Sequence, residues 1–465
     1  MDKDREQKVL ASLYDRLFDA VTYSPEGKSG LYSKNEIYFH MDQNHVLEPK
    51  DFEDMISPVN PNGNMKSTSA FSAMVDVLPK PSVRWDPGLN KLSKAYEEIV
   101  NGANTGAKPR PEQEKIYKQA SDFLRVEKKV KEFDGSETTQ IEPTSIAVAY
   151  DNAEAAYITA LGGYRTAYNG YDLDKKEDQR AWNAVEPGLQ LNLNNAWNNW
   201  TRQGKAQVEK AQNALASSIN DAISSVIRSS QRLVSDEFKS PPLAGEGKWL
   251  RSYALPTSWA SASAKGSKLK FTSAYLNKTE SSVAQKYSAE LSASWGLWHG
   301  SAKASGGNKE ENKHMDAQNF TLEAELITVS IMRPWFNPLL FTMNQWFVEG
   351  YEKNQISNAD AANLKGIMPL VPVGLVIARD VKISADFSEE DKKTISSQLD
   401  TEASFGWGPF GIKGGYSRET SSSEMKTKFD GATLQLPGLQ VIAWISSITP
   451  ASPPQSAPAS ATAGR

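Results

Sequence analysis

Histidine side chains are the first candidates for chemistry. The chain of 465 residues has four histidines, and His40 and His45 flank Asp42. On a strand, His40 and Asp42 share a face, and a turn would bring in His45. Imidazole and carboxylate groups are ordinary metal ligands. This spacing matches no established ligand motif, so a surface loop is the preferred interpretation and no metal site is predicted.

Carboxylates form the second candidate. Glycosidases use two such groups as acid and base or nucleophile. Two pairs have the required residue type, namely Asp380 with Asp386 and Glu290 with Glu402. All four fall on the polar faces of alternating stretches, where a solvated charge is the ordinary outcome. A carboxylate-dependent enzyme therefore ranks third among the functions considered.

Several other chemistries lack the residues that they need. There is no cysteine, which excludes thiolate catalysis, Cys-zinc sites, iron–sulfur clusters and disulfides. Neither a G-x-S-x-G elbow nor a G-x-x-x-x-G-K-[ST] phosphate loop occurs. The sequence therefore favours a non-enzymatic protein, and no cofactor is predicted.

Charge and hydropathy restrict the partners and the location. The formal net charge is −4 and the pI is about 5.8, which argues against a nucleic-acid partner. The longest apolar run, residues 367–378, is too short for a membrane-spanning helix and contains Pro369 and Pro372. The first residues lack the apolar core of a signal peptide. We expect a soluble protein that is cytoplasmic as synthesised, with leaderless export left open.

The secondary-structure elements that must position any site have their clearest sequence pattern in the second half. Two stretches there alternate between apolar and polar residues. Residues 281–296 place most apolar side chains on odd positions and most polar ones on even positions, which is typical of a strand with one buried face. Residues 394–408 repeat the design. Trp295 and Trp407 are 407 − 295 = 112 positions apart, and the same offset aligns both stretches without a gap.

The preceding residues extend this similarity into two related hairpin units, residues 265–337 and 375–446. Under the same offset Leu269 aligns with Val381, and Phe271 with Ile383. An even offset keeps the same face apolar in both units. The sequence therefore predicts an antiparallel β domain made by internal duplication.

The first half shows helical periodicity instead. Apolar residues recur every three or four positions over residues 5–23, 90–100 and 189–238. The last range fits either one long helix in a coiled-coil arm or two helices that break near Gly204.

We therefore predict an α+β fold with a change of class at a linker. A mainly helical domain spans residues 1–239, and a Pro- and Gly-containing linker spans residues 240–248. The duplicated β domain follows at residues 249–449. The Pro-, Ala- and Ser-rich residues 450–465 are expected to be a disordered tail.

Aromatic residues gather at the ends of the two matched stretches. They are Trp295, Trp298, Phe405, Trp407 and Phe410. One interpretation is core packing at one end of a sheet, and the other is an exposed aromatic rim suited to contact with a protein, a sugar or a membrane interface.

The function expected first is binding or self-assembly through this aromatic-rich end, with a protein partner or a second copy. The alternative is a membrane-active, toxin-like protein that inserts long amphipathic hairpins and forms pores, because transmembrane strands show the same alternation over about nine to eleven residues. An ordinary sheet with one face on a core gives an identical pattern.

Overall fold

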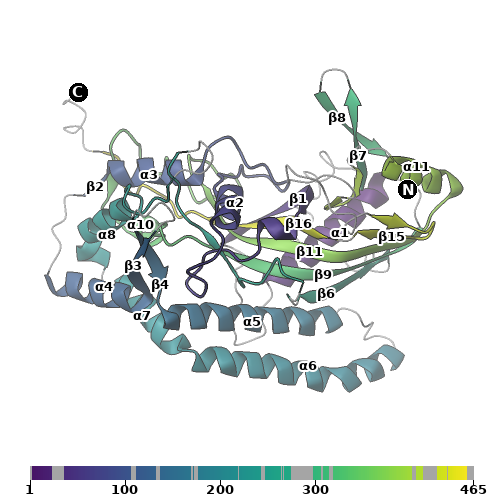
Figure 1. The fold of residues 1–465 in the computed structure, drawn as a ribbon, viewed down its shortest axis with the longest axis horizontal. Coiled ribbons are helices and arrows are strands. Elements are labelled where there is room, and N and C mark those ends of the chain that lie inside the picture. Colours follow the sequence, from purple (N-terminus) through teal and green to yellow (C-terminus); the bar gives the residue numbers. More distant parts are fainter. Residues whose placement is uncertain are drawn as a thin grey trace.

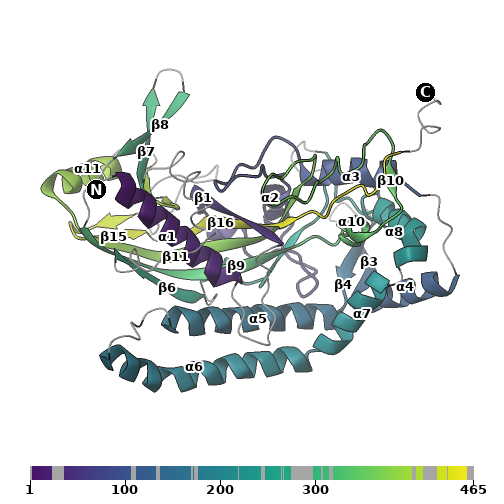
Figure 2. The ribbon, with the colours of Figure 1, turned by 180° about the vertical axis from the view of Figure 1, so that it is seen from behind.

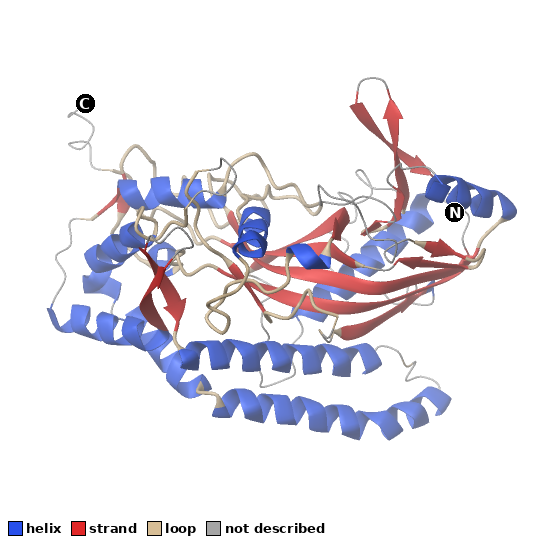
Figure 3. Ribbon diagram, viewed as in Figure 1, coloured by secondary structure: helices blue, strands red, loops and turns tan. Residues whose placement is uncertain are grey.

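An antiparallel sheet of eight strands runs through the molecule (Figure 1). The computed structural model describes residues 3–22, 36–105, 111–131, 137–168, 171, 176–217, 219–241, 247–262, 264, 266–273, 297–304, 307–313, 318–400, 405–411, 427–436 and 438–457. The α+β class predicted from the sequence is confirmed, because many helices accompany this large sheet (Figure 3).

The strands of the large sheet come from both halves of the chain. They are β1 (Ile37–Leu47), β5 (Tyr253–Leu255), β6 (Ser267–Thr272), β9 (Gln318–Met332), β11 (Leu370–Asp386), β14 (Lys428–Phe429), β15 (Thr433–Leu436) and β16 (Leu439–Ile448). Smaller sheets contain β2 (Ala103–Asn104) with β10 (Phe347–Val348), β3 (Arg125–Lys131) with β4 (Glu137–Pro143), and β7 (Trp298–Ala304) with β8 (Gly307–Lys313), β12 (Phe405–Trp407) and β13 (Phe410–Gly411).

The helices form layers around this sheet. They are α1 (Lys3–Thr22), η1 (Pro49–Asp51), α2 (Met65–Val75), α3 (Leu92–Gly102), α4 (Pro111–Leu124), α5 (Ser145–Tyr168), α6 (Lys176–Arg202), α7 (Lys205–Ser217), α8 (Ile219–Leu233), α10 (Leu339–Thr342) and α11 (Glu389–Asp400). Helices α5 and α6 lie side by side beneath the sheet, whereas α3, α4, α7, α8 and α10 gather at one end of it (Figure 1). The break near Gly204 is present, since α6 ends at Arg202 and α7 begins at Lys205.

Strand β11 is the centre of the sheet. One edge pairs with β9, from Gly374 opposite Ser330 to Asp386 opposite Gln318. Its other edge pairs with β16 over its first part and with β15 over its last part. Strand β6 pairs with the far edge of β9. The result is two successive hairpins, β6–β9 and β11–β15, which lie next to each other in one ladder.

Two expectations about domains differ from this arrangement. Strand β1 precedes the predicted linker by about 190 residues but pairs with β16, so the division at residues 240–248 does not separate the sheet from the first half. Apolar residues of β1 are buried in the cores on both faces of that sheet, as Phe39 and Leu47 show, so burial overrides sequence order. Part of the predicted tail is also ordered, because Asn354 and Ile356 donate backbone hydrogen bonds to Pro453 and Ser452.

The predicted strand over residues 394–408 is wrong in its first half, where α11 stands instead. Ser388 and Asp391 explain this: the backbone N–H of Asp391 donates to the Ser388 hydroxyl over 3.1 Å, and that hydroxyl donates to the Asp391 carboxylate over 2.7 Å. This is an N-terminal helix cap. The buried Ile395 and the partly buried Leu399 lie four positions apart, a spacing that satisfies one helix face and one strand face alike. The matching stretch, residues 281–296, lies outside the described residues.

Candidate functional site

The predicted histidine cluster belongs to the sheet rather than to a loop. His40 and Asp42 are buried on β1. The Nδ1 of His40 donates to the Ser82 carbonyl at 2.6 Å, and its Nε2 accepts from the Ser446 hydroxyl at 3.0 Å. Burial lowers the pKa of His40 to about 4, so the ring is neutral at pH 7. The Asp42 carboxylate accepts from the Trp444 indole at 2.8 Å. Both side chains therefore act as hydrogen-bonding parts of the sheet.

No group of three or more metal-ligating side chains forms among the residues that the structure describes. His45 is opposite Val441 across the β1–β16 ladder, after a register shift. The carboxylates do not converge on a cavity either. Asp380 and Asp386 are exposed on β11, and Asp386 accepts from the Asn319 amide at 3.0 Å. Glu290 and Glu402 lie outside the described residues.

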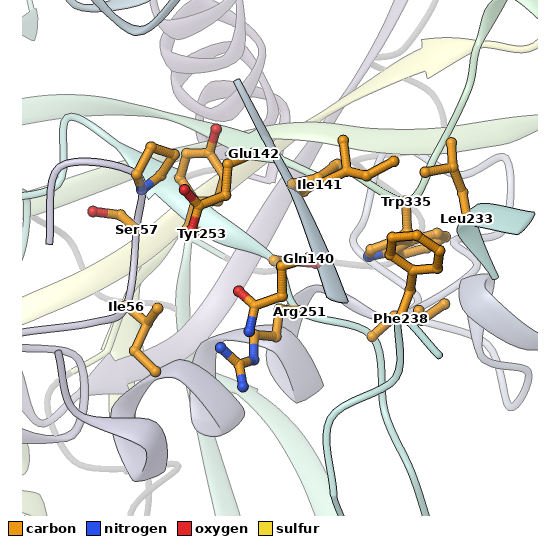
Figure 4. A pocket seen from close by; sticks show the side chains of 14 residues that line it. Ile56, Ser57, Gln140, Ile141, Glu142, Leu233, Phe238, Arg251, Tyr253 and Trp335 are labelled. Carbon is orange, nitrogen blue, oxygen red and sulfur yellow. The ribbon is translucent and has the colours of Figure 1, made fainter. Parts of the chain in front are cut away.

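A small cavity of about 40 Å³ lies between β4, β5 and the loop after β9 (Figure 4). Gln140, Glu142 and Tyr253 line it, together with apolar residues such as Trp335. Glu142 is paired with Lys128 at 2.7 Å. Cavities of this volume hold a few water molecules at most, whereas ligand sites usually measure about 300–1,000 Å³. This cavity is too small for a substrate.

A second cavity, of about 350 Å³, adjoins the first at Tyr253. It is lined by β3, β4, α5, α7 and the end of β9, and Asp151 on α5 contributes a carboxyl group to it. Burial raises the pKa of Asp151 to about 7. One turn along the helix, burial and the charge of Asp151 raise the pKa of Glu154 to about 7 against the opposing effect of Lys205.

The sequence interpretation missed this acidic pair, although a signal was present. Asp151 and Glu154 are the only acidic residues of the 24-residue helix α5, which otherwise carries mainly Ala, Tyr and other apolar residues. Two acids spaced three apart on an otherwise apolar helix indicate partly desolvated carboxyl groups.

Three of the five predicted aromatic contact residues lie in the core. Trp298 and Phe410 are 0% exposed and Trp407 is 1% exposed. Trp298 on β7 stands directly opposite Trp407 on β12, and the Trp407 ring also packs against Phe320 at 5.6 Å between centroids. Phe405 is in β12 opposite Gly300, and Trp295 lies outside the described residues. The three buried rings do not form an exposed rim. They join two distant parts of the chain in one core.

These two parts leave the large sheet at the same end. Residues 273–317 connect β6 to β9, and residues 387–432, which return to the sheet through the short strand β14, connect β11 to β15. The pairs Asp386–Gln318, Ser384–Thr433 and Thr272–Thr321 show that all four strands meet there. We call this end of the sheet the insertion end. The connection from β6 to β9 is the first insertion, and the connection from β11 to β15 is the second insertion. Their lengths, 317 − 272 = 45 and 432 − 386 = 46 residues, are nearly equal.

The described parts of the two insertions contact each other rather than standing apart. Strand β7 of the first pairs with β12 of the second, and the Gly408 N–H donates to the Leu297 carbonyl at 2.7 Å. Hairpin β7–β8 projects from the sheet, and α11 lies at the same end (Figure 1). Two hairpins of one sheet thus carry matched, mutually paired insertions in place of tight turns.

Among the described residues, no helix is long and apolar enough to cross a membrane. No family model, no curated protein and no solved structure matches this chain. The candidate functional site therefore follows from geometry alone, and we take it to be the insertion end.

Proposed function

We propose that this protein is self-assembling and membrane-active, and that its two insertions enter lipid as long β-hairpins that prolong β6–β9 and β11–β15. The observation that carries the proposal is the pair of nearly equal insertions at one end of two adjacent antiparallel hairpins. Tight turns suffice to join antiparallel strands, so connections of about 45 residues need another reason.

Length and backbone chemistry support the proposal. A transmembrane strand needs about nine to eleven residues, so either insertion can supply two such arms and a turn. In lipid every backbone N–H and C=O group needs a protein partner. Strands β6, β9, β11 and β15 already hold the correct antiparallel register, so growth of the hairpins would continue an existing ladder.

The sequence of the first insertion supports the same conclusion. Residues 281–296 alternate, with Leu291 and Ala293 on the apolar face and Ser292 on the polar face. Strands that separate lipid from water show this alternation. In this arrangement the charged Lys286 and Glu290 face water.

Self-assembly follows from the open edges. Two hairpins make four strands, and the outer two would each expose unpaired backbone groups to lipid. Neighbouring copies of the chain must supply the missing partners. This keeps the self-assembling part of the expected function and moves it from an aromatic rim to the strands themselves.

Dye release from liposomes is the first test. We expect leakage that depends steeply on protein concentration, together with large assemblies on the vesicles by light scattering. The absence of leakage over a range of lipid compositions and pH values would contradict the proposal.

A second test uses the absence of cysteine, which makes any introduced thiol unique. We would label Leu291→Cys and Ser292→Cys with a polarity-sensitive dye. With vesicles, the label at position 291 should report lipid and the label at position 292 should report water. Equal responses at the two positions would argue against an inserted strand.

A further inference from the structure

Helix α1 lies across one face of the large sheet (Figure 2). Its apolar stripe is buried against that face and consists of Val9, Leu10, Leu13, Tyr14, Leu17, Phe18 and Val21. The Tyr14 hydroxyl donates to the Phe39 carbonyl of β1 at 3.1 Å, and the two rings pack edge to face at 5.3 Å. The helix is thus fixed to the sheet by extensive apolar contact.

The same helix also covers the junction between the two insertions. A Cβ placed on Gly408 would lie 3.5 Å from a methyl group of Leu13 and 3.8 Å from one of Leu10. Gly408 donates to Leu297 of the first insertion and accepts from the Gln43 amide of β1 at 3.3 Å. Leu10 and Leu13 therefore lie directly over the point where both insertions and β1 meet.

One continuous core joins these parts. The apolar residues of α1 belong to the same buried cluster as Leu297 and Trp298 of the first insertion and Trp407 and Phe410 of the second. An insertion cannot leave this cluster without exposing the apolar face of α1, and α1 cannot leave without exposing the bases of both insertions. The two events are therefore coupled through shared buried surface.

We infer that α1 is an autoinhibitory cover that must move off the sheet before the two insertions can leave it. This inference rests on the proposed function and adds its regulation. While α1 is docked, Leu10 and Leu13 hold the Gly408 junction closed. Contact with a lipid surface offers the apolar stripe of α1 an alternative partner, since an amphipathic helix binds a membrane interface through its apolar face.

Thiol reactivity tests the movement of α1. Ser12 is a buried residue of α1, and Ser72 is an equally buried residue of α2 on the other side of the sheet. In Ser12→Cys the thiol should react slowly in solution, and its rate should rise about tenfold or more when leaking vesicles are present. In the control, Ser72→Cys, the rate should stay low. A thiol at position 12 that remains protected after leakage is complete would overturn the inference.

A pair of matched cavity variants tests whether α1 restrains leakage. Leu13 and Leu375 are both fully buried, but Leu375 belongs to the separate core on the other face. Leu13→Ala should accelerate leakage about tenfold. The cavity that this change leaves destabilises docked α1, and the free energy lost is large enough for a tenfold or greater change in rate. Leu375→Ala should not accelerate it. Equal rates, or slower leakage with Leu13→Ala, would contradict the inference.

These outcomes distinguish failure of the proposed role of α1 from failure of the proposed membrane activity. If the unmodified protein and every variant fail to release dye, the proposed function itself is wrong. If the unmodified protein leaks while the position-12 thiol stays protected and Leu13→Ala has no effect, the function stands and the cover does not.

Discussion

The insertion end and the opposite end of the sheet both have apolar cores, but they differ in the buried ionisable groups near them. At the insertion end, large apolar side chains such as Trp298, Trp407 and Phe410 form the core. Toward the other end, ionisable groups are buried: burial raises the pKa of Asp151 to about 7 and lowers that of Arg333 to about 10. Apolar contacts respond to solvent and lipid, whereas buried charges respond to pH. We therefore expect lipid to act on the insertion end, and pH to act on the helical end.

The largest expected effect is at the insertion end. Trp407→Ala should lower the free energy of unfolding by about 3–5 kcal/mol, because it removes a buried indole that touches both insertions. The loss should be the same at pH 5 and pH 8. Urea unfolding at the two pH values measures it, with the exposed Val59→Ala as the control. A loss of stability that depends strongly on pH would contradict the expected difference between the two ends.

Asp151→Asn should show the reverse behaviour. The raised pKa means that the stability from the neutral carboxyl is fully present below about pH 4 and is lost as pH rises through about 7. At pH 8 the variant should exceed the unmodified protein by about 2–4 kcal/mol, and this gain should vanish near pH 4. Urea unfolding across this range gives the comparison. Asp122→Asn, at an exposed position on α4, should give no such trend.

His40 lies in the middle of the sheet and should make stability depend on pH with the opposite sign. Its pKa is lowered by burial, so its contribution is present above about pH 6.5 and is lost as pH falls through about 4. The unmodified protein should lose about 2–3 kcal/mol of stability from this group on acidification. His40→Asn should remove that acid-dependent loss from urea-unfolding curves. If the variant loses as much stability on acidification as the unmodified protein, other groups cause the loss.

The smallest effect concerns the local signal that makes the second insertion begin as a helix. Ser388→Ala removes the cap of α11 and should cost about 1 kcal/mol. Hydrogen exchange should accelerate in α11 while the rates in β7–β8 stay the same. Faster exchange in both insertions would mean that they open as one unit even in the absence of lipid.

The fold class and a helix over residues 90–100, observed at residues 92–102, could be predicted from the sequence because each follows from periodicity. Periodicity left a break near Gly204 as one of two alternatives, and the structure contains that break. The helix α11 could not be predicted from alternation alone. Ile395 and Leu399 suit both a strand and a helix, and the cap at Ser388 decides between them. That dual character also fits a segment that changes conformation, as the proposed function requires.

The candidate site was only partly predictable. The sequence points to Trp298, Trp407 and Phe410, but they are buried in a core completed by α1, which lies nearly 300 to 400 residues earlier in the chain. Sequence periodicity identifies a buried face and leaves open which element covers it. The equal insertions became visible only when the ladder fixed which strands are neighbours.

The pairing of β1 with β16 has a consequence for the order of folding during synthesis. His40 and Ser446 lie 406 positions apart and still share a hydrogen bond. Contacts of such sequence separation form late and slow folding. A ribosome adding about 5–20 residues per second would make β1 long before its partner emerges. Until β16 is made, β1 has an unpaired edge and α1 has no complete face to dock on, so both stay exposed while the rest of the chain is synthesised.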